Sequence, residues 1–227
     1  MHGTLTYTTS VGTELSSINR WAENNILILN NNKSIEIVIF NSDKTRVSAP
    51  PVAPLPGIKR EDSITILGVT FQSNLSVKPH VTNIIQSSAQ SLYALKLLKS
   101  HGMQFKTLQL ICQATVLSRI TYASPSWWGF TTADDKQNLQ AILNRAVKWG
   151  FLDTSHSSLE QICTKREEDL FAKILSKPHH VLYHLLPPEK TTSYSLRPGP
   201  HNRLLTKKGG TMQSKNFVQR LIFRNVY

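Results

Sequence analysis

Two adjacent carboxylates, Asp134 and Asp135, come closest in this chain to a catalytic metal site. Paired acids can hold the divalent cations that activate a hydroxyl for phosphoryl transfer, and that geometry needs apolar strands on both sides of the pair. Here polar residues 136–138 follow, and then apolar residues at helical spacing. We therefore expect both acids in the first turn of a helix capped by Thr132, and we assign neither to a metal.

Basic side chains at a predicted helix junction could instead hold a polyanion. Lys96, Lys99 and Lys106, together with His101, flank the place where one predicted helix ends and the next begins. Lysines in such positions can neutralise phosphates and hold a duplex without reading its sequence. The alternative is a solvated helix end, whose cations favour the helix dipole.

The charge of the chain is positive and unevenly distributed. The net charge is +12, and residues 187–227 carry 8 Lys/Arg against 1 Asp/Glu, whereas residues 127–186 carry 7 against 7. This balance favours nucleic acid as a partner before an anionic membrane surface, with simple solvation as the alternative for the final segment. Its candidate nucleic-acid-binding residues are Arg197, Arg203, Lys207, Lys208, Lys215, Arg220 and Arg224.

Four aromatic residues are close together in the sequence: Tyr122, Trp127, Trp128 and Phe130. Such rings can stack on bases, and they can equally pack between helices, which is the commoner use. No stretch of 18 apolar residues predicts a membrane span. The two cysteines, Cys112 and Cys163, belong to no Cys/His cluster, so we predict no zinc, and no motif predicts a small-molecule substrate or another cofactor.

The pattern of apolar residues predicts an α+β chain in three parts. Residues 1–76 read as a small α/β head with a helix at 11–25 and strands at 26–29, 35–39 and 64–71, the last with a bulge or a close backbone approach at Gly68. Residues 77–186 read as an all-α body, with glycine stops at Gly102 and Gly150 and a final helix capped by Ser157 with Glu160. Residues 187–227 read as a basic, partly irregular tail with a short apolar cluster at 217–223 that could be a docking helix or strand.

One segment of the head resembles the reverse transcriptases of non-LTR, LINE-type retrotransposons. The family pattern W-x-x-x-N-x-L-x-L-N-x-x-K-T-x-x-x-x-x-F, which follows its catalytic hairpin, is matched with Ser34 in place of threonine. The matching residues are Trp21, Asn25, Leu27, Leu29, Asn30, Lys33 and Phe40. Leu67, Gly68 and Val69 look like the family's L-G-V element, although Gln72-Ser73 stands where an aspartate is usual. Residues 92–101 and 122–128 look like the thumb of the Jockey-related clades.

The resemblance implies a role for each part. The head would be the end of the polymerase palm, with Lys33 near the incoming nucleotide and Leu67, Gly68 and Val69 in the hairpin that grips the primer. The body would be the thumb, with RNA or an RNA–DNA hybrid as the partner. The family's catalytic carboxylates, which use Mg²⁺, would lie upstream, so we expect no polymerase activity from this chain alone. For Lys33 an exposed loop lysine is an equally good interpretation, and for residues 67–69 an ordinary strand.

The alternative hypothesis is a non-enzymatic helical scaffold that binds nucleic acid or protein and whose likeness to a palm and thumb is incidental. The two hypotheses differ in their expected affinity for an RNA–DNA hybrid at low salt. A nuclear or cytoplasmic location follows only by analogy with the life cycle of such elements.

Overall fold

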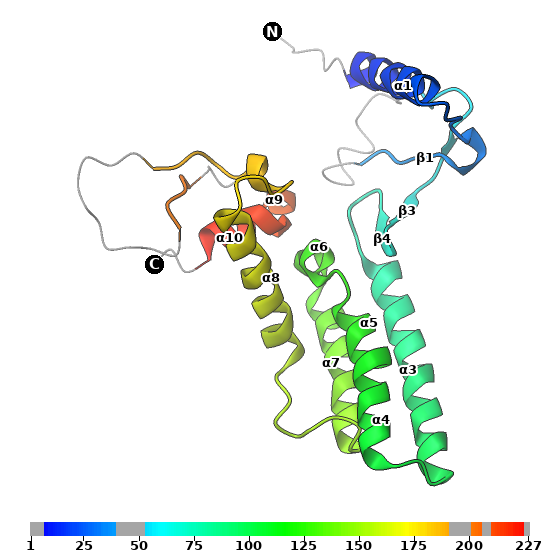
Figure 1. Cartoon of the computed structure of the whole chain (residues 1–227), viewed down its shortest axis with the longest axis vertical. Helices are drawn as coiled ribbons and strands as arrows, with labels where there is room; N and C mark the ends of the chain where they lie inside the picture. Colours follow the sequence, from blue (N-terminus) through cyan, green and yellow to red (C-terminus); the bar gives the residue numbers. More distant parts are fainter. Residues whose placement is uncertain (1–6, 40–52, 191–200, 206–209, 225–227) are drawn as a thin grey trace. The chain divides into compact units, whose positions relative to one another are not determined.

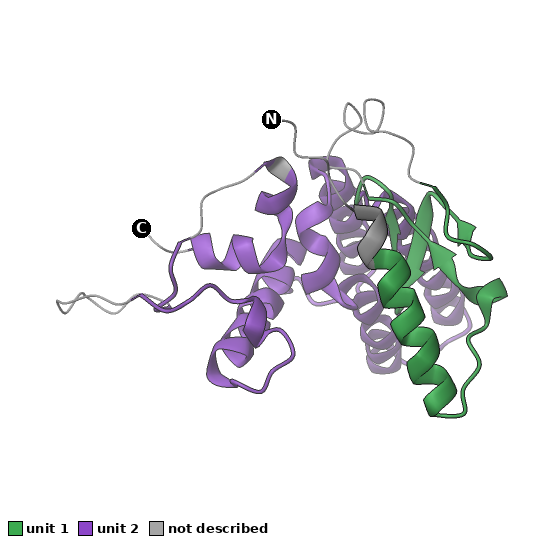
Figure 2. Cartoon of the chain, turned by 90° about the horizontal axis from the view of Figure 1, so that it is seen from above, with its two compact units in different colours: residues 1–75 green, residues 76–227 purple. Residues whose placement is uncertain are grey.

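The computed structural model describes residues 7–39, 53–190, 201–205 and 210–224. The chain divides into two compact units, Met1–Leu75 and Ser76–Tyr227, and this division lies beside the predicted boundary after residue 76 (Figure 2). Most described residues are helical and a few form short strands, which confirms the expected α+β class. The likeness of the parts to a palm and a thumb stays a prediction.

The described part of the first unit contains one long helix and four short strands (Figure 1). The strands pair two by two, β1 with β2 in parallel and β3 with β4 antiparallel. A bidentate ion pair joins the first two strands, because Arg60 Nη2 lies 3.0 Å and Arg60 Nε 3.1 Å from the Glu36 carboxylate. The elements are α1 (Tyr7–Asn24), η1 (Asn31–Lys33), β1 (Ile35–Glu36), β2 (Lys59–Arg60), β3 (Ser63–Ile66) and β4 (Val69–Gln72).

The prediction of a strand at residues 26–29 is wrong. The Leu27 amide donates to the Ala22 carbonyl at 2.9 Å and the Ile26 amide to the Glu23 carbonyl at 3.1 Å, which is the paired pattern of a Schellman cap. Ile26 takes the left-handed position of that cap, with φ 58°, although a β-branched residue is strained there. The backbone of this apolar run therefore closes α1 and forms no ladder.

The strand predicted at residues 64–71 is instead a hairpin. Leu67 and Gly68 form its two-residue turn with φ values of 47° and 84°, and Ile66 pairs with Val69 across it. Two successive positive φ values are typical of the tight turns that match the twist of an antiparallel pair. Gly68 therefore serves the turn, where its lack of a side chain removes the strain, and forms no bulge. Of the strand predicted at 35–39, only Ile35–Glu36 pairs.

The second unit is helical (Figure 1). Along the chain, a shorter helix that continues through a π-helical turn lies between two long helices, and a third long helix follows. The elements are α3 (Lys78–Ser100), α4 (Phe105–Cys112), the π turn η2 (Gln113–Leu117), α5 (Ser118–Thr121), α6 (Ser124–Trp127), η3 (Trp128–Phe130), α7 (Ala133–Lys148), α8 (Leu159–Ser176), η4 (Tyr183–Leu185), α9 (Thr211–Lys215) and α10 (Phe217–Phe223).

The core of this unit lies where α3 packs on α4, α5 and α7 (Figure 1). Its fully buried side chains recur at the three- and four-residue spacing that the sequence shows, and include Leu92, Leu95, Leu108, Ile120, Leu139 and Ile142. The helices predicted from this spacing are confirmed, and so are the stops at Gly102 and Gly150. The last predicted cap lies one residue later than expected. Ser158 and Gln161 form the capping box of α8, because each donates a backbone amide to the other's side chain.

The described part of residues 187–227 packs into the second unit, so it is less irregular than predicted, and its apolar cluster at 217–223 docks as a helix. Phe171 on α8 forms an apolar cluster with Val218, Leu221 and Ile222 on α10. Burial of these side chains holds α10 against α8.

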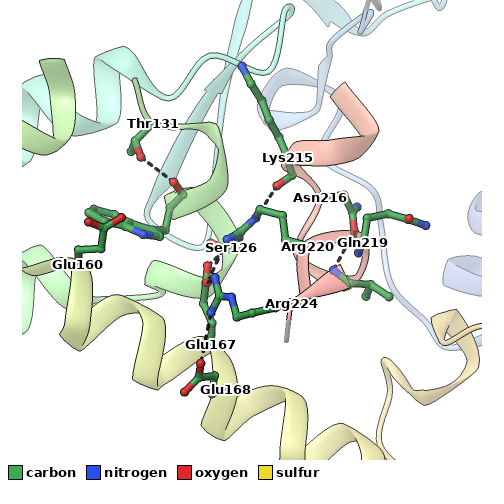
Figure 3. Close-up of polar contacts among 12 residues, drawn as sticks. Ser126, Thr131, Glu160, Glu167, Glu168, Lys215, Asn216, Gln219, Arg220 and Arg224 are labelled. Atoms are coloured by element: carbon green, nitrogen blue, oxygen red, sulfur yellow. Dashed lines mark hydrogen bonds and ion pairs between the residues drawn. The ribbon is translucent and has the colours of Figure 1, made fainter. Parts of the chain in front are cut away.

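Ion pairs reinforce this contact (Figure 3). The fully buried Glu167 carboxylate accepts from Arg220 Nη2 at 2.6 Å, from Arg220 Nη1 at 3.0 Å and from Arg224 Nη2 at 2.9 Å. We call these three residues the Glu167 clamp. A buried carboxylate without cations would be strongly destabilising, so the clamp makes docking of α10 a condition for the burial of Glu167.

We predict that Gly129→Ala loosens the docked α9–α10 segment. A Cβ at this position would overlap the Lys215 carbonyl oxygen and the Arg220 guanidinium, so the segment has to shift. Overpacking of this kind costs about 1–3 kcal/mol, which denaturant unfolding would measure. Gly210→Ala is the matched control, because nothing lies within 4 Å of a Cβ there. Equal stability of the two variants would contradict the packing described.

We predict that His80 makes the stability of the second unit fall at acid pH. The ring is buried edge-on against Trp127 at 5.3 Å, its Nε2 has no hydrogen-bond partner among the described residues, and burial lowers the pKa of His80 below its usual 6.5. Above that pH the ring is neutral in both states. Between 6.5 and the lowered pKa of the folded state only the unfolded chain takes up the proton, so the free energy of unfolding falls by up to about 1.4 kcal/mol per pH unit in that window.

The measurement is denaturant unfolding of the wild type and His80→Phe between pH 7.5 and 5.5. The variant keeps a ring against Trp127 and removes the titrating group, so its stability should depend less steeply on pH. Parallel pH profiles for the two proteins would show that His80 does not carry this dependence.

Candidate nucleic-acid interface

Three helix ends meet at one end of the second unit: the carboxyl ends of α3 and α7 and the amino end of α4 (Figure 1). Two glycines close the carboxyl ends, because Gly102 and Gly150 have φ values of 84° and 79° and occupy the left-handed position of Schellman caps. The cap at Gly102 turns the chain from α3 directly into α4, and the cap at Gly150 directs Phe151 into the core. Two local stop signals thus determine where α3 and α7 end.

Lys99 ties these helix ends together. Its Nζ donates to the Trp149 carbonyl oxygen at the end of α7 at 3.2 Å, and lies 5.5 Å from the centroid of Phe105 and 5.9 Å from that of Phe151. Lys96 Nζ similarly lies 5.7 Å from the Trp149 ring. The carbonyl, together with the negative faces of the rings, compensates the two ammonium groups without a carboxylate.

The local charge at this end is strongly positive. Residues 94–106 and 145–156 carry 5 Lys/Arg and 1 Asp/Glu. All five cations are exposed. The one acid, Asp153, accepts from the Ser155 amide at 3.0 Å, and this bond lowers the pKa of the carboxyl. We call this group the basic end: Lys96, Lys99, Lys106, Arg145 and Lys148 with Phe105 and Trp149.

The chemistry available at the basic end is binding. Exposed ammonium and guanidinium groups can neutralise phosphates, and a protein that does so releases counterions and gains affinity for any nucleic acid. The alternative of a solvated helix end accounts for Lys99, whose ammonium caps α7. It does not account for Lys106, which lies at the amino end of α4, where a cation is unfavourable for the helix dipole.

The predicted residues of the first unit lie apart from one another in the chain and differ in exposure. Lys33 ends η1 and is exposed, and residues 28–32 line an open hollow of about 450 Å³ just before it. Leu67 is 86% exposed at the tip of the β3–β4 hairpin, whereas Val69 is buried. The structure thus presents a hairpin tip at the L-G-V element, and contact of that tip with a primer stays a prediction.

The predicted cations of residues 187–227 that the structure describes lie in three different environments. Arg220 and Arg224 belong to the Glu167 clamp. Arg203 is buried, where its guanidinium bonds the Tyr183 hydroxyl at 2.8 Å and the Pro187 carbonyl at 3.2 Å and pairs with Glu189 at 3.3 Å. Lys215 is exposed at the end of α9. Arg197, Lys207 and Lys208 lie outside the described residues.

The aromatic pair Trp127 and Trp128 packs between helices. Both rings are buried and meet edge to face at 6.0 Å, and Trp127 Nε1 donates to the Tyr122 carbonyl at 2.9 Å. Their indoles therefore fill the interior and present no face to a base. Tyr122 is 54% exposed.

The acids at the start of α7 serve the helix end. Asp135 Oδ2 accepts from the Thr132 amide at 3.2 Å, and Thr132 Oγ1 accepts from the Asp135 amide at 3.1 Å, so the predicted cap is confirmed. Asp134 is exposed in the same turn. Within the described ranges, no group of three or more His, Cys, Asp or Glu residues is arranged to hold a metal. Cys112 and Cys163 are buried free thiols, and burial raises their pKa values to about 11 and about 12.

The sequence interpretation omitted Phe105, Arg145, Lys148 and Trp149 from the candidate site. Phe105 has the helical spacing of an apolar stripe, and Lys148 lies in the last turn of its helix, so neither residue stands out in the sequence as a ligand-binding group. A usable signal was present, because α3 and α7 have glycine stops and are separated by one helical connection, which brings their carboxyl ends to the same side of the bundle.

None of the helices in the described part of the chain is long and apolar enough to span a bilayer. Comparison of the chain with family models, with curated proteins and with solved structures finds no match.

Proposed function

We propose that this chain is part of an RNA-directed DNA polymerase of a non-LTR retrotransposon, and that the part given by these residues binds template–primer nucleic acid without catalysing polymerisation. The observation that carries the proposal of nucleic-acid binding is the basic end, with five exposed cations and one acid that is engaged in its own turn. Exposed cations gathered at one end of a helical bundle raise the local positive potential and attract a polyanion.

Two further features support the polymerase assignment. The L-G-V residues are at the turn of a hairpin, and Gly68 leaves the backbone of that turn open to close approach by a sugar–phosphate chain. A helical unit follows the hairpin directly, in the order that the family resemblance implies. RNA or an RNA–DNA hybrid is the proposed ligand, and Mg²⁺ would belong to the intact polymerase.

A protein-binding scaffold is the second candidate function. Tyr93 and Leu97 lie one turn apart on α3 and are 68% and 50% exposed, and exposed apolar pairs of this kind are common in helix-mediated contacts. If the protein shows no affinity for nucleic acid at low salt, that result would favour the scaffold function.

We predict that binding depends on the lysines of the basic end. The triple variant Lys96→Gln, Lys106→Gln and Lys148→Gln should weaken binding of an RNA–DNA hybrid at least tenfold at low salt. It should also flatten the plot of log affinity against log salt by about 0.7–0.9 for each lost phosphate contact. Fluorescence anisotropy with a labelled hybrid measures both quantities.

The matched control is the triple variant Lys165→Gln, Lys173→Gln and Lys177→Gln, which removes the same charge from exposed positions of α8 and the residue that follows it. A purely nonspecific effect of net charge would weaken both variants equally. That result would remove the basic end as the binding site.

We predict that the purified chain does not extend a primer with Mg²⁺ and deoxynucleotides, because Asp135 is engaged in the capping box of α7. Asp135→Ala, which removes the acceptor of the Thr132 amide, should instead lower stability by about 0.5–2 kcal/mol, as the loss of a capping contact does. Primer extension and thermal unfolding measure the two effects. Incorporation that is abolished by Asp134→Asn would contradict the assignment of these acids to a helix end.

A further inference from the structure

Phe105 is a large apolar ring in an unusual position for a protein core residue. It is the first residue of α4 and is 45% exposed, although its spacing from Leu108 and Cys112 predicts a place on the buried stripe. Leu108 and Cys112 are fully buried. The ring therefore stands at the surface, among the cations of the basic end.

The ring is held in this position by its neighbours. A Cβ on Gly150 would lie 2.6 Å from Phe105 Cζ, so the ring closely approaches the turn that ends α7, and only glycine leaves room for it. Lys99 Nζ lies 5.5 Å from the ring centroid, within reach of a cation–π contact. An exposed ring with restricted freedom has little conformational entropy left to lose when a flat ligand stacks on it.

The second aromatic residue of the basic end has a supporting role. Trp149 is only partly exposed, packs edge-on against the buried Phe151 at 6.2 Å and lies beneath Lys96 at 5.7 Å. Its carbonyl oxygen accepts the bond from Lys99. Trp149 thus fixes the two lysines, whereas Phe105 offers the more open ring.

We infer that Phe105 stacks on an unpaired base, and that the basic end therefore binds single-stranded nucleic acid in preference to duplex. This inference rests on the proposed function and specifies its ligand. Bases within a duplex are stacked on one another and present no free face, whereas an unpaired base can lie on an aromatic ring while neighbouring lysines neutralise its phosphates. Because every base has a π-face, the site needs no particular sequence.

The test is fluorescence anisotropy with three labelled probes: a 12-nucleotide oligo-U RNA, a 12-nucleotide oligo-dT DNA and a 12-base-pair RNA–DNA hybrid. Phe105→Leu keeps an apolar side chain beside Gly150 and removes the ring face, so it should weaken binding of both single strands about 5- to 100-fold and leave binding of the hybrid nearly unchanged. Phe105→Tyr should bind as the wild type does. The tighter of the two single strands identifies RNA or DNA as the ligand.

Tyr122→Leu is the matched control, since it removes another exposed ring from the same unit and should change none of the three affinities. The inference is overturned if Phe105→Leu binds the single strands as tightly as the wild type, or if it weakens single strands and hybrid equally. In either case the dependence on Lys96, Lys106 and Lys148 would still support nucleic-acid binding. If the unaltered protein bound none of the probes at low salt, the proposed function itself would fail.

Discussion

The ammonium group of Lys99 on α3 donates a hydrogen bond to the Trp149 carbonyl at the carboxyl end of α7, and it lies near the rings of Phe105 and Phe151. A cation at a helix carboxyl end contributes about 0.3–1 kcal/mol, and an exposed cation–π contact about 0.5–1 kcal/mol. Contributions of this size help to hold α3 and α7 together at the basic end. The arrangement depends on the two glycines that end α3 and α7, because these stops bring the carbonyl, the rings and the lysines to one end of the bundle.

The Glu167 clamp and the basic end use basic residues in opposite ways. In the clamp, Arg220 and Arg224 surround a fully buried carboxylate, and their charges hold α10 on α8. At the basic end, the compensating groups are a carbonyl and neutral rings, so the net charge stays available to a ligand. A count of charge along the sequence places the excess in residues 187–227, whereas three of the cations there, Arg203, Arg220 and Arg224, are engaged in contacts that stabilise the fold.

Regular features of the second unit could be predicted from the sequence because they depend on local signals. The apolar stripe of α3, the glycines after α3 and α7, and the cap at Thr132 each act within a few residues. The pairing of Arg220 and Arg224 with Glu167 joins residues more than fifty positions apart, and no local pattern marks it. The basic end was found in part, since Lys96, Lys99 and Lys106 flank one turn, but Arg145 and Lys148 join them only through the packing of α7 on α3.

In the first unit, two runs of apolar residues do not form the strands that their composition predicts. Residues 26–29 have the composition of a strand, yet the Schellman cap at Ile26 takes the backbone amides that a ladder would use. Residues 64–71 have the composition of one strand, yet the Leu67-Gly68 turn divides them into a hairpin. Ile26 and Ile28 are 96% and 97% exposed. In both runs, the hydrogen bonds of a single turn outweigh the preference of the apolar residues for a continuous strand.

Hydrogen exchange of the protein with and without a bound RNA–DNA hybrid that carries a single-stranded overhang tests the central claim, that nucleic acid binds at the basic end. Amides in residues 99–109 and 147–153 should exchange more slowly in the complex, while those of α8 and α10 should be unchanged. Protection confined to α10 or to the first unit, with exchange at the basic end unaffected, would contradict it.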